Sequence, residues 1–89
     1  MLLDLKTSSG DPRKGTLTVI EVDDLGAETS SLFTGSIDKS ISSQFVTFIE
    51  DKTKTPIMLP KNAVNTGRFQ STPLMSDSKK RLLQLIASK

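Results

Sequence analysis

The feature of this sequence that most restricts its fold is a series of short apolar runs, each ended by a polar turn containing Gly, Pro, Asp or Ser. The clearest run, residues 44–50, carries apolar side chains on both faces, which is typical of a central strand. The same pattern predicts further strands near residues 2–7, 16–22, 31–37 and 56–59. A mobile loop across residues 23–43 is the alternative to the strand at 31–37, which Gly35 weakens.

The first two predicted strands form a hairpin. Residues 8–15 contain two glycines and an Asp-Pro pair, so we expect a turn there with Arg13 and Lys14 at its tip. In the second strand the apolar residues change phase between Val19 and Ile20. Such a change indicates either a β-bulge or a strand that is buried on both sides.

The C-terminal segment, residues 76–88, predicts an amphipathic helix. Ser76 suits its N-cap. The stripe that we expect to face the sheet consists of Lys79, Leu82, Leu83 and Ile86, and Leu85 broadens it. A helix of about a dozen residues is marginal on its own, so contacts of this stripe with the sheet must stabilise it.

These elements predict one α+β domain over residues 1–89. The favoured architecture is a small, mostly antiparallel, partly open barrel of about five short strands with a C-terminal α-helix, like SH3 or OB modules. An open meander sheet covered by the helix is the alternative.

One short segment adds to the preference for a barrel. Residues 60–64 suit a single turn of helix, because Pro60 can occupy its start. The segment Leu59–Val64 resembles the helical turn that precedes the last strand of SH3 domains, although it lacks the aromatic residue of that motif. The chain also has no Trp or Tyr for an aromatic peptide groove, so recognition of proline-rich peptides is not expected.

The chain has few large apolar side chains for its size. It has 89 residues, 35% of them hydrophobic, and phenylalanine is its only aromatic residue. Either its stability is marginal, or a partner or second copy completes the core. The absence of Cys excludes disulfides. No run is long enough for a signal peptide or a membrane span, so we expect a cytoplasmic protein without membrane association.

The side chains that usually carry catalysis are missing. The chain has no His, Cys or Tyr, which removes the common general bases and strong nucleophiles. Its tightest carboxylate pair is Asp23 and Asp24, and adjacent residues of an extended segment point to opposite faces, which suits a shared metal poorly. No glycine-rich loop has the composition of a phosphate-binding loop. We therefore expect no enzyme activity, no cofactor and no metal.

Charge divides the chain into an acidic front half and a basic rear half. Residues 1–44 carry a net charge of −3, whereas residues 45–89 carry +5. This asymmetry indicates an anionic partner, although a mixed, solvated surface is the alternative. Residues 79–81 are basic and lie in the first turns of the helix, where the dipole disfavours cations, and this mismatch suggests a bound anion. The alternative, slightly favoured, is that exposed lysines cost little in salt and only keep the surface soluble.

These observations predict a small nucleic-acid-binding protein that contacts the phosphate backbone of DNA or RNA with basic loop tips and the helix N-terminus. Phe69, beside Arg68, is a possible stacking group. The alternative is a protein–protein interaction module, such as an adaptor, an inhibitor or an assembly subunit, with a homodimer as one of its forms. The predicted nucleic-acid-binding residues are Arg13, Lys14, Lys52, Lys54, Arg68, Phe69, Lys79, Lys80 and Arg81.

Overall fold

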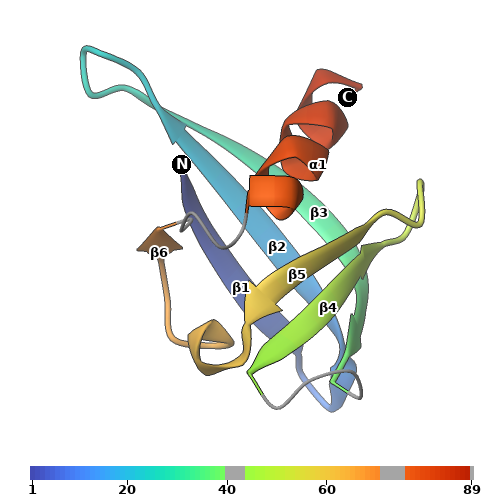
Figure 1. Ribbon diagram of the computed structural model, residues 1–89. Coiled ribbons are helices and arrows are strands. Elements are labelled where there is room, and N and C mark those ends of the chain that lie inside the picture. Colours follow the sequence, from blue (N-terminus) through green and yellow to red (C-terminus); the bar gives the residue numbers. More distant parts are fainter. Residues whose placement is uncertain (40–43, 71–75, 89) are drawn as a thin grey trace.

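The computed structural model describes residues 1–39, 44–70 and 76–88. They form a six-stranded sheet in the order β5-β4-β3-β2-β1-β6, curved into a half-barrel, with one C-terminal helix (Figure 1). Every neighbouring pair of strands is antiparallel. The predicted α+β fold with a small barrel-like sheet is therefore confirmed, with one strand more than the five expected.

The strands have these bounds: β1 (Leu2–Ser8), β2 (Asp11–Val22), β3 (Glu28–Asp38), β4 (Phe45–Glu50), β5 (Pro56–Pro60) and β6 (Phe69–Gln70). A turn of 3-10 helix, η1 (Lys61–Ala63), links β5 to β6, and the helix α1 spans Ser76–Ala87. β3 begins three residues before the predicted strand at 31–37, so a regular strand replaces the alternative of a loop there. Residues 40–43 of the predicted loop lie outside the described residues, as does the side chain of Ser76.

The predicted turn at residues 8–15 is wrong in its extent. The turn is only Ser9 and Gly10, because Gly10 adopts a φ of 82° that permits a tight reversal. Thr7 pairs with Gly15 while Ser8 pairs with Asp11, so three residues, 12–14, bulge out of the ladder with β1. Arg13 and Lys14 consequently belong to β2 and not to a hairpin tip.

The change of phase in β2 reflects burial on both faces of the sheet. The ladders of β2 with β1 and β3 continue through Val19 and Ile20 without a shift of register. Val19 is fully buried in the core, and Ile20 on the opposite face is only 2% exposed. Of the two predicted explanations, two-sided burial is the one observed, and it ends at Val22, which is half exposed.

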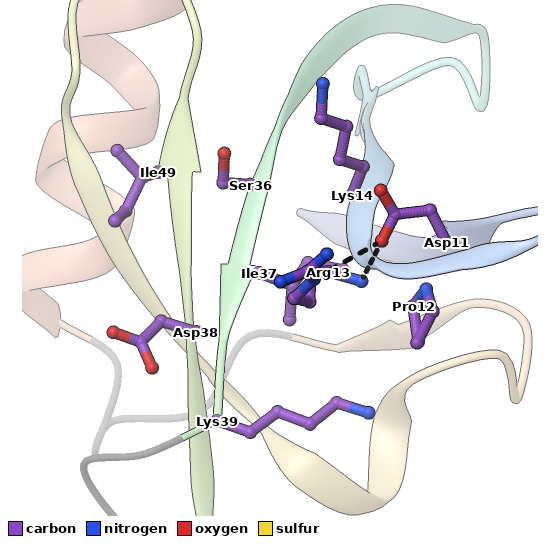
Figure 2. A pocket seen from close by; sticks show the side chains of 9 residues that line it. All are labelled: Asp11, Pro12, Arg13, Lys14, Ser36, Ile37, Asp38, Lys39 and Ile49. Carbon is purple, nitrogen blue, oxygen red and sulfur yellow. Dashed lines mark hydrogen bonds and ion pairs between the residues drawn. The ribbon is translucent and has the colours of Figure 1, made fainter.

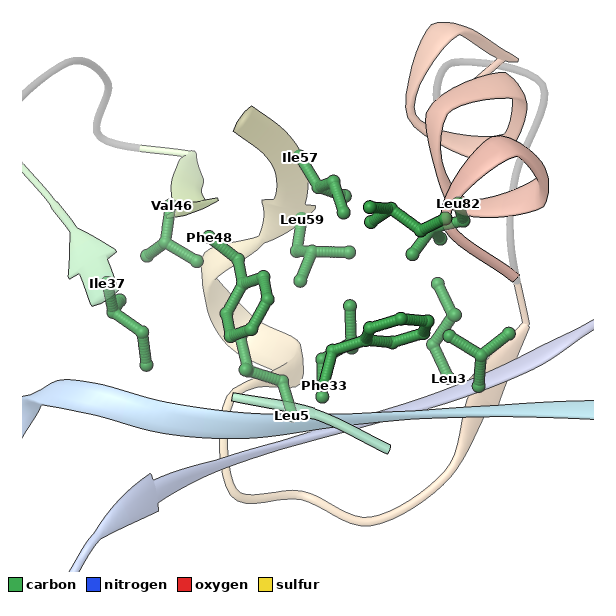
Figure 3. Close-up of a cluster of buried hydrophobic side chains, with 12 residues drawn as sticks. Leu3, Leu5, Phe33, Ile37, Val46, Phe48, Ile57, Leu59 and Leu82 are labelled. Atoms are coloured by element: carbon green, nitrogen blue, oxygen red, sulfur yellow. The ribbon is translucent and has the colours of Figure 1, made fainter. Parts of the chain in front are cut away.

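The concave side of the half-barrel contains the hydrophobic core (Figure 3). Side chains from β1 to β5 meet Leu82 and Leu85 of α1 there. The observed helix face differs from the predicted stripe, since Leu83 is 43% exposed and Ser78 is buried. The core consists of Leu3, Leu5, Leu17, Val19, Phe33, Ile37, Val46, Phe48, Ile57, Leu59, Leu82 and Leu85.

The helix closes the outer edge of β5 through Ser78. Its hydroxyl accepts a hydrogen bond from the Met58 amide and donates one to the Met58 carbonyl, both at 3.0 Å. Alternate residues of a strand direct their backbone groups to the same side, so Pro56 and Pro60 share this edge with Met58. Because proline has no N–H, Met58 carries the one outward amide among these three residues. The β5 edge therefore offers no free donor to another strand.

The opposite edge of the sheet is closed by Asn65. Its amide donates to the Leu5 carbonyl at 2.8 Å, and its Oδ1 accepts from the Thr7 amide at 2.9 Å. The residue adopts a φ of 62°, a left-handed conformation that Asn tolerates better than most residues. The chain from η1 to β6 thus covers β1 beyond its short ladder with β6.

A Ser78→Ala variant should lose about 1–3 kcal/mol of unfolding free energy, because the amide and the carbonyl of Met58 would both lose their partner. Chemical denaturation monitored by circular dichroism measures this loss. Ser36→Ala is the matched control, since Ser36 is exposed, and should change stability by less than about 0.5 kcal/mol. Equal effects of the two substitutions would contradict the structural importance of the Ser78 hydroxyl.

Candidate functional site

The nine predicted binding residues lie on four parts of the fold. Arg13 and Lys14 are in β2, Lys52 and Lys54 are in the turn between β4 and β5, Arg68 and Phe69 lie at the start of β6, and Lys79, Lys80 and Arg81 are in α1. Strand register and side-chain contacts determine which of them share a surface.

A row of directly paired residues connects Lys14 with the β5 edge. Lys14 pairs with Ser36, Ser36 with Ile49, and Ile49 with Pro56. Directly paired residues project from the same face of a sheet. This is the outer face, because Phe48, the neighbour of Ile49, points into the core. Three strand spacings separate the Cα atoms of Lys14 and Pro56 by about 14 Å.

Arg81 lies at the β5 end of this row. Its Nη1 donates a hydrogen bond of 2.8 Å to the carbonyl oxygen of Pro56. Lys54 lies in the turn just before Pro56, where it adopts a φ of 59° and donates its amide to the Glu50 carbonyl. We call Lys14, Lys54 and Arg81 the basic strip. Lys14 projects from the outer face at one end of the row, Lys54 lies in the turn at the β5 end, and Arg81 reaches that end from the helix on the concave side.

A shallow hollow of about 780 Å³ lies beside Lys14 (Figure 2). Arg13 and Lys39 also line it, together with the carboxylates of Asp11 and Asp38. The Nε of Arg13 lies 3.7 Å from Oδ1 of Asp11, but the Arg13 side chain is 88% exposed, so water screens this ion pair strongly. The three bases outnumber the two acids, which favours an anion weakly at this end of the strip.

Lys39 was not among the predicted binding residues. It follows the end of β3 and reaches the hollow because β3 lies between β2 and β4. The predicted strand ended at residue 37, and no local pattern connects Lys39 with Lys14, which lies 25 positions earlier. Only the pairing of β2 with β3 brings the two lysines to one surface.

Arg68 and Phe69 lie away from the basic strip. Nη1 of Arg68 is 3.0 Å from Oε2 of Glu28, so a carboxylate on β3 balances its charge. Phe69 pairs with Leu3 and packs, half-buried, against the core. An ion-paired guanidinium and a partly covered ring are less available to a nucleic acid than the sequence suggested.

The three bases of α1 point in different directions. Successive residues of a helix are rotated by about 100°, which separates Lys79 from Arg81 by about 160°. Ser78 and Arg81 share the flank that faces β5, whereas Lys79 lies on the other flank. Lys80 is exposed on the side away from the core. The contact of Arg81 with Pro56 also explains this cation near the helix N-terminus without a bound anion.

Lys52 lines a second hollow, of about 410 Å³, on the side of the turn that faces the end of α1. Leu32, Glu50 and Leu85 are among its other lining residues. Glu50 is buried, and its carboxylate accepts hydrogen bonds from the amides of Lys52 and Thr53. This carboxylate therefore organises the β4–β5 turn that carries Lys52 and Lys54.

The acidic pair at residues 23 and 24 also has a structural explanation. Oδ1 of Asp23 accepts hydrogen bonds of 2.9 Å from the amides of Leu25 and Ala27, which shapes the turn between β2 and β3. Within the described ranges, no cluster of three or more acidic side chains is arranged to hold a metal ion.

The aromatic side chains are mostly covered. Phe33 and Phe48 belong to the core, and Phe45 and Phe69 are half-buried. Phe45 alternates with Phe48 along β4 and so projects from the outer face, as the two-faced pattern of this strand predicted. No fully exposed ring therefore accompanies the basic strip.

Comparison of the chain with protein-family models, with curated proteins and with solved structures found no match. In the part of the chain that the structure describes, no helix combines the length and the apolar character needed to cross a bilayer.

Proposed function

We propose that this chain is a small non-catalytic nucleic-acid-binding protein that contacts the phosphate backbone of DNA or RNA through its basic strip. The proposal rests on the cross-strand row that joins Lys14 to Pro56, with Arg81 bound to the Pro56 carbonyl. A strip about 14 Å long corresponds to about four base-pair steps along the axis of a duplex, at roughly 3.4 Å per step. Because no exposed ring adjoins the strip, the affinity is electrostatic and shows little sequence preference.

The experiment is a fluorescence-anisotropy titration with single- and double-stranded DNA and RNA oligonucleotides at several salt concentrations. We expect dissociation constants between about 1 and 100 μM at about 50 mM salt, weakening steeply as salt rises. Lack of binding at about 100 μM protein, or an affinity that does not change with salt, would overturn the proposal.

Charge reversal within and outside the strip distinguishes a surface from a general effect of net charge. Lys14→Glu should weaken binding about tenfold and lower the salt slope by roughly one. Lys79→Glu changes the net charge equally, but Lys79 lies on the helix flank away from β5, so it should weaken binding only about twofold. Equal losses in the two variants would argue against the strip.

A protein-interaction module is the second candidate function, since none of the described residues pairs with one side of β3 near the β2–β3 turn. β3 extends well beyond its ladder with β4, whereas Ser78 and Asn65 close the edges of β5 and β1. An open strand edge is the usual place for pairing with another chain.

A further inference from the structure

The open edge is the side of β3 that faces away from β2, near the hairpin turn. β3 pairs with β2 from Glu28 to Ser36, but with β4 only from Gly35 to Asp38. Figure 1 shows the β2–β3 hairpin extending past β4. Among the residues that the structure describes, none continues the ladder along residues 28–32 of this edge.

Strand alternation identifies the backbone groups on this edge. The Thr34 carbonyl accepts a hydrogen bond of 3.0 Å from the Asp51 amide, so the backbone groups of Thr34 point away from β2. The backbone groups of every second residue share that direction. The N–H and C=O groups of Leu32, Ser30 and Glu28 therefore point to the open side of β3. The edge therefore presents three amides and three carbonyls at the regular spacing of a ladder.

This edge lacks the protection that β5 has. Residues 28–33 contain no Pro, Lys or Gly, and their ladder with β2 has no register shift that would twist them away. Leu32 is 61% exposed, and Leu25 in the adjoining turn is 95% exposed. The hollow of about 410 Å³ next to Leu32 leaves space between this edge and the end of α1. These features are those of a strand that accepts another strand.

We propose that the open edge of β3 pairs with the same edge of a second copy of this chain. Antiparallel pairing about a two-fold axis at Ser30 uses all three outward residues of both copies and forms about six hydrogen bonds. In this register Glu28 lies opposite Leu32 of the second copy. Two short strands bury a small area, so we expect a weak dimer with a dissociation constant in the micromolar range.

Charge explains why the partner is a second copy. Residues 15–35, which form most of the β2–β3 hairpin, contain four acidic residues and no basic residue. In the antiparallel dimer the acidic turn of each copy extends beyond Leu32 of the other copy. There it meets the β4–β5 turn, which the bond between the Asp51 amide and the Thr34 carbonyl holds beside β3. The exposed charges of this turn are Lys52, Lys54 and Asp51, a net charge of +1. Opposite charges thus meet twice in one symmetric contact.

Sedimentation equilibrium of the full chain at low salt, without nucleic acid, tests this proposal. The wild type should change from monomer to dimer between about 1 and 300 μM. Leu32→Glu should raise the dissociation constant at least about tenfold, because it replaces an apolar side chain by a carboxylate opposite Glu28 at two positions. Arg68, which pairs with Glu28, offsets only part of this repulsion, since that ion pair is half exposed and screened by water. Leu32→Lys should weaken the dimer less than Leu32→Glu, because the new lysine faces Glu28 of the other copy, whose carboxylate it shares with Arg68.

The matched control is Leu83→Glu, the same substitution at an exposed leucine of α1, which should leave dimerisation unchanged. Circular dichroism establishes that each variant remains folded, as expected for substitutions at exposed side chains. A wild type that stays monomeric throughout the range would overturn the proposal. A loss of the dimer in Leu83→Glu, or equal losses in Leu32→Glu and Leu32→Lys, would also exclude pairing in this register. Since the readout is mass, the result does not depend on nucleic-acid binding.

Discussion

A Gly35→Ala variant should lose at least about 3 kcal/mol of unfolding free energy, which is a large part of the roughly 5–13 kcal/mol expected for a domain of this size. Gly35 lies where β2, β3 and β4 meet, opposite Gly15 on one side and Glu50 on the other. A Cβ atom at Gly35 would lie 2.8 Å from Cζ of Phe48 and 2.9 Å from the carbonyl carbon of Ile49. Because the second contact involves backbone, relief requires β4 to move away from β3, which would open the core.

The matched control is Gly26→Ala, the same substitution in the turn between β2 and β3. Gly26 has a φ of 84°, but nothing lies within 4 Å of the added Cβ. Its cost should be about 1 kcal/mol, from the left-handed backbone alone. Thermal and urea denaturation measure both losses. A Gly35→Ala protein as stable as Gly26→Ala would show that β3 and β4 do not approach this closely at Gly35.

The second large effect should come from Leu82→Ala, with a loss of about 2–5 kcal/mol. Leu82 is fully buried and extends from α1 toward Ile57 and Leu59 of β5 (Figure 3). Truncation leaves a cavity between the helix and the sheet, and a helix of 12 residues is only marginally stable without such contacts. The helical signal in far-ultraviolet circular dichroism should therefore melt at a lower temperature than in the wild type.

Leu83→Ala controls for a change in helix propensity. Leu83 neighbours Leu82 but is 43% exposed, so its truncation should cost less than about 0.5 kcal/mol. If Leu83→Ala destabilised the protein as much as Leu82→Ala, the orientation of α1 on the sheet would be wrong. The same pair of variants connects stability with the proposed function, since undocking α1 would also release Arg81 from Pro56.

Local patterns in the sequence were sufficient to predict most elements of the fold. Two-residue alternation and β-branched residues located β1, β4 and β5 within about two residues, and the helical stripe located α1. The strand at β3 was left open because Gly35 weakens its pattern, although the close approach of β4 is what requires glycine there. The turn at residues 8–15 was predicted too long because the glycines and proline of a bulged strand resemble those of a loop.

The candidate site was less predictable, because it depends on which distant residues become neighbours. Arg68 appeared available until the fold brought Glu28, forty positions earlier in the chain, within 3.0 Å. Lys39 gave no signal at all. The predicted cluster of bases in α1 is divided by helix geometry, and only Arg81 contacts the edge of β5.

The sequence by itself determined that this chain is built from short strands with a C-terminal helix, and that it has no His, Cys or Tyr. It also determined the separation of acidic and basic halves, since charge and periodicity are local properties. Only the tertiary structure decided that Ser78 and two prolines close one edge, and that no described residue pairs with the outer side of β3 at residues 28–32. It also decided that Lys14 and the Arg81–Pro56 contact lie at the two ends of one cross-strand row. These relations depend on strand register and on pairing between distant segments. A local hydrophobic pattern of period two specifies the face of the sheet on which each residue lies, but it does not specify the partner strand.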